Sequence, residues 1–157
     1  SLEIENFRTF NFGLSKNKSL ENFSVNLKSA TNSLLLFSKD ANKSWEIQSL
    51  NNLDTITCKF DTLDNFCYQE KINFIDFIKI DVQGSEYLVL EGAKKTLLNK
   101  KIKVLQIEVI MADTYQGQKS IGYYISILES YGYKFINFSD CVFRNGILIQ
   151  SDLFFSI

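Results

Sequence analysis

Two carboxylates, Asp81 and Glu108, stand where predicted strands end, and they are the residues best placed to do chemistry. Asp81 lies in "FIKIDVQGSEYLVLEGAKKTLL" (77–98), where a strand turns sharply through Gly84 into a helix. Glu108 lies near the end of "KIKVLQIEVI" (101–110). In open α/β sheets, ligands bind beyond the carboxyl ends of the strands. If the two strands are neighbours, both carboxylates share one mouth and could accept a proton from a ligand.

Each candidate also has a purely structural interpretation. Asp81 could only accept hydrogen bonds from the start of the helix that follows it. Glu108 could lie just past the sheet edge in water, where its charge is not costly. Glu86 is explained by the dipole of the same helix, Lys79 by packing of its stem, and Tyr115 by packing or solvation on a loop. The residue pattern by itself leaves these alternatives open.

The composition excludes several kinds of site. The chain has no histidine, so a Ser-His-Asp triad, a histidine base and the commonest zinc sites are excluded. Its three cysteines form no CxxC pair, which predicts reduced thiols in a cytoplasmic protein. Neither GxxxxGK[ST] nor GxGxxG is present. The net charge of −1, with no apolar run of about 20 residues, predicts neither nucleic acid nor a membrane as partner.

Strands and helices alternate along the second half of the chain. Strands over 74–82 and 101–110 are nearly all apolar, which is typical of strands buried on both faces of a parallel sheet. Helical spacing from Ser85 and over 121–128 then predicts crossover connections, the second leading to a strand at 133–138. The prediction is one α/β domain over 157 residues, with a mostly parallel sheet.

The two ends of the chain complete this prediction. Asn145-Gly146 is a strong signal for an antiparallel hairpin near the C-terminus. Alternation of apolar and polar residues predicts earlier strands at 7–15, 20–27 and 55–60. The polar stretch 28–54 is expected to be a long excursion.

Several segments together resemble the FkbM-type S-adenosylmethionine-dependent methyltransferases. The most specific is "KIDVQG" with the helix after it, followed by the strand "VLQIEV". "FRTFNFGLSKNKSLENFSVN", "TNSLLLF", "ITCKFDTLDNF" and "LESYGYKFINF" resemble other parts of the family, so the resemblance runs from about Phe7 to Ile157. It implies a partial Rossmann-like methyltransferase fold.

The resemblance also implies an activity, which is methyl transfer from S-adenosylmethionine to a hydroxyl on a sugar, glycan or natural product. Asp81 is expected to act as the base or to orient the acceptor, with Glu108 assisting. By analogy with the fold, Gly13, Leu14 and Ser15 would border the cofactor. No metal is implied.

Two departures from the family pattern qualify this expectation. Gln83 stands where the family usually has glutamate, and no strand with a glycine-rich cofactor loop precedes Phe7. The chain is therefore expected to be the C-terminal portion of such a domain, with Ser1-Leu2 a possible cloning remnant. Its binding of S-adenosylmethionine should be weak or absent. The strand at 74–82 would lack a neighbour, so either a strand from residues 7–27 covers its edge or a second copy does, which favours a homo-oligomer. The alternative is a non-catalytic α/β fragment or interaction module derived from the same fold.

Overall fold

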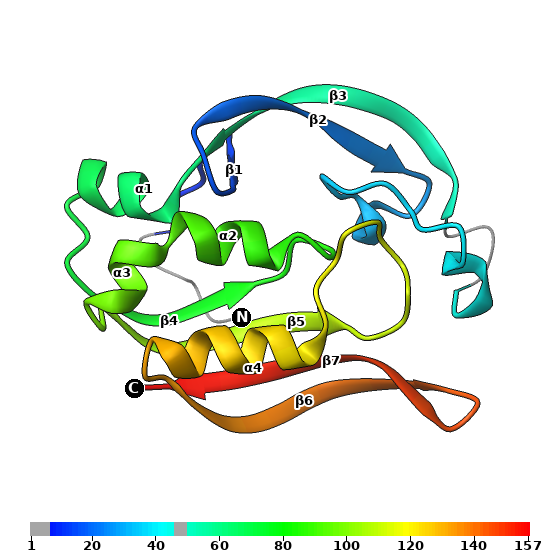
Figure 1. Cartoon of the computed structure of the whole chain (residues 1–157). Coiled ribbons are helices and arrows are strands. Elements are labelled where there is room, and N and C mark those ends of the chain that lie inside the picture. Colours follow the sequence, from blue (N-terminus) through cyan, green and yellow to red (C-terminus); the bar gives the residue numbers. More distant parts are fainter. Residues whose placement is uncertain (1–6, 46–49) are drawn as a thin grey trace.

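The computed structural model describes residues 7–45 and 50–157 and places their strands in two sheets (Figure 1). The first sheet has the order β1-β3-β2 and the second has the order β4-β5-β7-β6. The strands are β1 (Gly13–Leu14), β2 (Ser19–Asn26), β3 (Asn52–Asp61), β4 (Ile75–Ile80), β5 (Ile102–Ile110), β6 (Lys134–Arg144) and β7 (Ile147–Ser156). The helices are α1 (Leu63–Gln69), α2 (Glu86–Gly92), α3 (Lys94–Leu98) and α4 (Ile121–Ser130), with short 3-10 turns η1 (Ser29–Thr31) and η2 (Ala41–Lys43).

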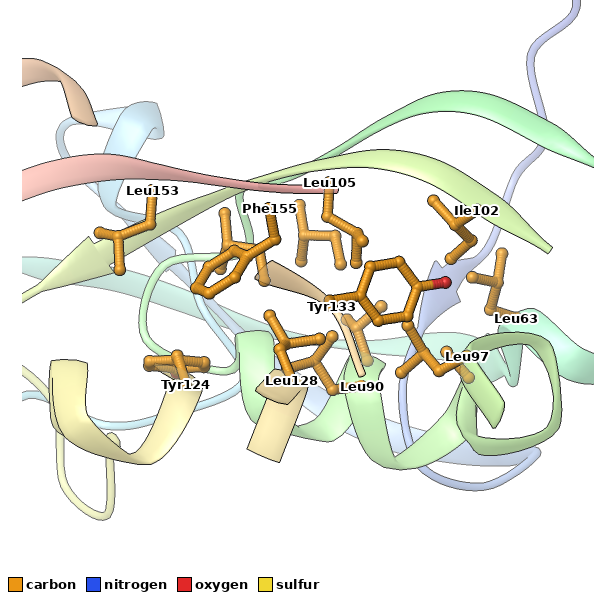
Figure 2. Close-up of a cluster of buried hydrophobic side chains, with 14 of the residues drawn as sticks. Leu63, Leu90, Leu97, Ile102, Leu105, Tyr124, Leu128, Tyr133, Leu153 and Phe155 are labelled. Carbon is orange, nitrogen blue, oxygen red and sulfur yellow. The ribbon is translucent and has the colours of Figure 1, made fainter. Parts of the chain in front are cut away.

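The main core fills the space between the four-stranded sheet and the helices α2, α3 and α4. Figure 2 shows strand residues such as Leu105 and Phe155 facing Leu90, Leu97 and Leu128 of the helices. All five are at most 1% exposed. Burial of this apolar surface is the main force that fixes the sheet and the helices relative to each other.

The α/β class is confirmed, but the expected mostly parallel sheet is not what the structure shows. Within the described part of the chain, only the pairs β1–β3 and β4–β5 are parallel, whereas β2–β3, β5–β7 and β6–β7 are antiparallel. The strand predicted at 133–138 does run in the same direction as β5. The hairpin strand β7 lies between them, however, and pairs with both.

Two predicted elements are shorter than the sequence pattern indicated. Of the strand predicted at 7–15, only Gly13–Leu14 pairs with a neighbour. Before it, Phe10 packs edge-on and Phe12 packs tilted against Phe66. The helix predicted from Ser85 to Leu98 is interrupted at Ala93. There the Asp64 carboxylate takes the free N–H groups at the start of α3.

The predicted C-terminal hairpin is confirmed. Asn145 and Gly146 both adopt positive φ angles, +50° and +76°, as a two-residue hairpin turn requires. The described helices are all too short or too polar to cross a bilayer.

One edge of the four-stranded sheet is open. β4 is the outermost strand and pairs only with β5 among the described residues. Phe77, in the middle of β4, is 52% exposed. The apolar run that predicted a strand buried on both faces therefore forms an edge strand with one exposed face.

Candidate functional site

The carboxyl ends of β4 and β5 bring Asp81 and Glu108 together. The two strands are parallel neighbours with Ile80 beside Ile107, so the residue that follows each is a carboxylate at the same level. Both carboxylates line one cavity of about 350 Å³. The expectation that these strands are adjacent and that the two residues share a mouth is confirmed, whereas their catalytic role stays a prediction.

Gln83 links the two carboxylates. Its side-chain N–H group donates to Asp81 Oδ1 at 3.1 Å and to Glu108 Oε2 at 2.6 Å. The other oxygen of Glu108 accepts from Gln150 at 2.6 Å. An amide at position 83 supplies donors where a glutamate would add a third carboxylate, so the departure from the family pattern suits this arrangement.

Burial and neighbouring charge raise the pKa of Glu108 to about 8. Loss of solvation is the largest cause, followed by the charges of Asp81 and Glu86 and by a hydrogen bond with Asp81. Glu108 therefore holds its proton more tightly than an exposed glutamate does. Lys79 forms an ion pair with Asp81, with its Nζ 3.1 Å from Asp81 Oδ2.

The turn that presents Asp81 is held by Glu86. Gln83 and Gly84 have φ angles of +54° and +90°, a conformation that rarely persists without support. Glu86 Oε1 accepts the backbone N–H groups of Val82 at 3.1 Å and of Gly84 at 3.0 Å. The Tyr124 hydroxyl lies 3.4 Å from Glu86 Oε2.

Glu86 supports the candidate site from below its turn, a role that the sequence pattern did not predict. It is 1% exposed, and burial raises its pKa to about 7 against the opposing effect of the backbone N–H groups that it accepts. A signal was available, because Glu86 lies on the same helical stripe as Leu90, Ala93 and Leu97 at spacings of four, seven and eleven residues. A charged residue on a buried stripe must have internal partners.

Tyr115 closes the same cavity from the loop after β5. Its ring stacks on Phe37 with centroids 5.3 Å apart, and its hydroxyl lies 3.0 Å from the Thr31 carbonyl oxygen and 3.2 Å from Gln83 Oε1. Burial, with the nearby carboxylate charges, raises its pKa, so it stays protonated and acts as a donor. The expectation of simple packing is correct for the ring, but the hydroxyl belongs to the polar network. Gly84 is needed here, since an added Cβ would come within 2.7 Å of the Tyr115 ring.

A second cavity of about 440 Å³ lies on the other side of Asp81 and Gln83. Gly13 and Leu14, predicted to border a cofactor, line it together with Asp81. Ser15 does not line this cavity. Its backbone N–H donates to the Asp61 carbonyl oxygen at 2.9 Å.

Comparison with known families finds one matching family model. The methyltransferase FkbM domain matches residues 1–135, so the chain belongs to this family of methyltransferases. No curated protein and no solved structure matches the chain. Members of this family generally use S-adenosylmethionine.

Proposed function

We propose that this chain contributes to an S-adenosylmethionine-dependent O-methyltransferase that acts on a hydroxyl of a sugar, glycan or natural product. The observation that carries the proposal is that Asp81 and Gln83 line both cavities. A methyl transfer needs a donor and an acceptor that meet at one point, with a group there to take the acceptor's proton. Asp81 stands at such a meeting point.

The cavity of about 440 Å³ suits the donor. Its walls include Leu14, Phe23 and Phe60, which offer apolar surface to a purine ring. Among the described residues that line it, Asp81 is the only charged one, and a carboxylate attracts a positively charged sulfonium. When bound, S-adenosylmethionine supplies an electrophilic methyl group. Gly13 contributes space through its backbone, because a side chain there would clash with Phe60.

The cavity of about 350 Å³ suits a hydroxylated acceptor. Glu108, Gln83 and Gln150 offer hydrogen-bond partners, and Trp45 with Tyr115 offers aromatic surface. In this proposal Asp81 accepts the proton of the acceptor hydroxyl. Glu108 keeps its own proton near neutral pH and orients Asp81 through their hydrogen bond.

We further propose that residues 1–157 form one α/β domain that corresponds to the C-terminal portion of the methyltransferase domain. Binding of S-adenosylmethionine to the isolated chain should therefore be weak. In the family's fold, a glycine-rich loop and a ribose-binding carboxylate would supply further contacts to the cofactor. Calorimetry with S-adenosylmethionine tests this part, and low-micromolar binding would contradict it. The alternative, a non-catalytic interaction module, is favoured by the open edge of β4.

The activity itself is tested in the complete reading frame that encodes this chain. Methyl transfer from labelled S-adenosylmethionine to a panel of sugars and hydroxylated natural products identifies an acceptor. With that acceptor, Asp81→Asn should lower kcat/KM by about a hundredfold or more, as expected for loss of a general base. Asp76→Asn is the matched control, because Asp76 is an exposed aspartate on the same strand. Equal activity of the two variants would refute the role of Asp81, and no transfer to any acceptor would favour the interaction module.

A further inference from the structure

A separate cavity of about 760 Å³ lies at the opposite end of β4 and β5 from Asp81. Its lining includes Lys71 and Asn73, just before β4, and Lys101, just before β5. β4 is six residues long, so the two ends are about 20 Å apart along the strand. Of the described residues that line this cavity, none lines either cavity of the candidate site.

Four lysines surround this cavity, Lys16, Lys71, Lys95 and Lys101. Within residues 7–45 and 50–157, none of the four takes part in an ion pair. Four like charges around one cavity repel each other, which is unfavourable for the folded protein. A bound anion would offset this repulsion.

The two carboxylates in the lining do not offset these charges equally. Both oxygens of Asp64 are engaged, accepting the backbone N–H groups of Lys95 at 2.9 Å and Thr96 at 2.8 Å. Burial and, after it, the charge of Glu91 raise the pKa of Tyr87 and of Tyr123, which are not among the described residues that line the cavity. Four lysines against two carboxylates leave a formal excess of two positive charges in a chain whose net charge is −1.

We propose that this cavity binds a small molecule with two or more phosphate groups, of the nucleoside diphosphate type. Ammonium groups bind phosphate oxygens as point charges, and the Asn73 and Asn99 amides in the lining add neutral donors. Tyr68 lies in the same lining and is 82% exposed, so its ring is free to stack on a base or sugar. The site is independent of the methyl-transfer proposal, because it uses none of the same residues.

Calorimetry with ADP and the 157-residue chain tests this inference. ADP should bind, and the affinity should fall between 50 and 200 mM salt because screening weakens the lysine–phosphate attraction. The double variant Lys71→Gln/Lys101→Gln should bind about tenfold more weakly or worse, since two charges are lost. Lys134→Gln, an exposed lysine on β6, is the matched control and should bind within about twofold of the unchanged chain.

Three further measurements separate the parts of the proposal. Asp81→Asn should leave ADP binding unchanged, and a large loss there would place the nucleotide in the candidate active site instead. Inorganic pyrophosphate should bind more weakly than ADP, and Tyr68→Leu should remove that difference. If ADP does not bind at millimolar concentration, or if the double lysine variant binds as well as the control, the phosphate site is refuted.

Discussion

The two ends of the parallel pair β4–β5 differ in charge and in how their polar groups are satisfied. At the carboxyl end, Asp81, Gln83 and Glu108 bond to one another. At the amino end, lysines such as Lys71 and Lys101 surround a cavity without an ion pair among the described residues. A satisfied network contributes to stability, whereas unpaired charges contribute only when a ligand arrives. Substitutions at the carboxyl end should therefore change folding, and those at the amino end should change binding.

The largest effect is expected from Glu86→Ala. The change leaves the buried N–H groups of Val82 and Gly84 without an acceptor and opens a void, which should lower the free energy of unfolding by about 3–5 kcal/mol. Glu86→Gln keeps an acceptor oxygen at the same place and should lower the free energy of unfolding much less. Lys101→Gln, at the other end of the strands, should change stability by no more than about 0.5 kcal/mol. Urea unfolding measures the stability of all three variants. Equal stabilities would contradict the proposed difference between the two ends of β4–β5.

The next effect is the pH dependence that Glu108 gives to stability. Its folded pKa of about 8 lies above its ordinary value of 4.5, so the folded state binds the proton more tightly. The stability from this proton is fully present below about pH 4.5 and is lost as the pH rises to about 8. Glu108→Gln removes the titration and should raise the free energy of unfolding at pH 8, relative to the unchanged chain, by about 3 kcal/mol.

Urea unfolding at pH 5 and pH 8 checks this sign. Glu86, whose pKa of about 7 is also raised, adds a slope of the same direction between about pH 4.5 and 7. The Glu108→Gln variant should therefore keep part of the slope but not all of it. A stability that rises from pH 5 to pH 8 in the unchanged chain would contradict the account.

The sequence predicted the carboxyl end better than the amino end for a physical reason. Asp81 and Glu108 each follow an apolar strand directly, and parallel neighbours bring such positions together. The lysines around the other cavity range from Lys16 to Lys101 along the chain, so only the folded structure brings them to one place. The sequence also did not predict the hydrogen bonds from the turn at 82–84 to Glu86, because a glutamate at the start of a helix usually faces solvent.

The order of strands was predictable only in part. Apolar runs and the Asn145-Gly146 turn located β4, β5 and the final hairpin. No local signal says that β7 inserts between β5 and β6, although the central strand β7 is largely buried and the outer strand β6 is largely exposed. The separate β1-β3-β2 sheet was likewise not predicted, because β2 and β3 are joined by long-range pairing across the polar excursion.

A smaller effect is expected from Gly84→Ala. Position 84 has a φ of +90°, and an added Cβ would come within 2.7 Å of Tyr115, so the change should cost about 2 kcal/mol. Gly146→Ala is the matched control, with φ of +76° and open space around the new methyl group. Gly146→Ala should lower the free energy of unfolding by about 1 kcal/mol. If thermal unfolding shows the same loss for both, the ring of Tyr115 does not restrict the turn.

The smallest effect on folding, and a distinct effect on assembly, is expected at the edge of β4. We expect the isolated chain to form a homo-oligomer, because this edge has unpaired backbone groups beside the exposed ring of Phe77. Phe77→Lys places a second charge beside Lys79 and should shift the chain toward monomer with a small change in stability. Light scattering over a concentration series measures this, and a monomer before the substitution would refute the expectation.

The most direct test of the coupled carboxyl site is a carbon-detected NMR titration of the side-chain carboxyl groups. The account predicts that Glu108 titrates with a midpoint of about pH 8 and that Asp81→Asn lowers this midpoint, because one negative neighbour is removed. Asp76→Asn, on the same strand but outside the site, should leave the midpoint unchanged. A midpoint for Glu108 near its ordinary 4.5 that is indifferent to Asp81 would contradict the claim that the ends of β4 and β5 form one site.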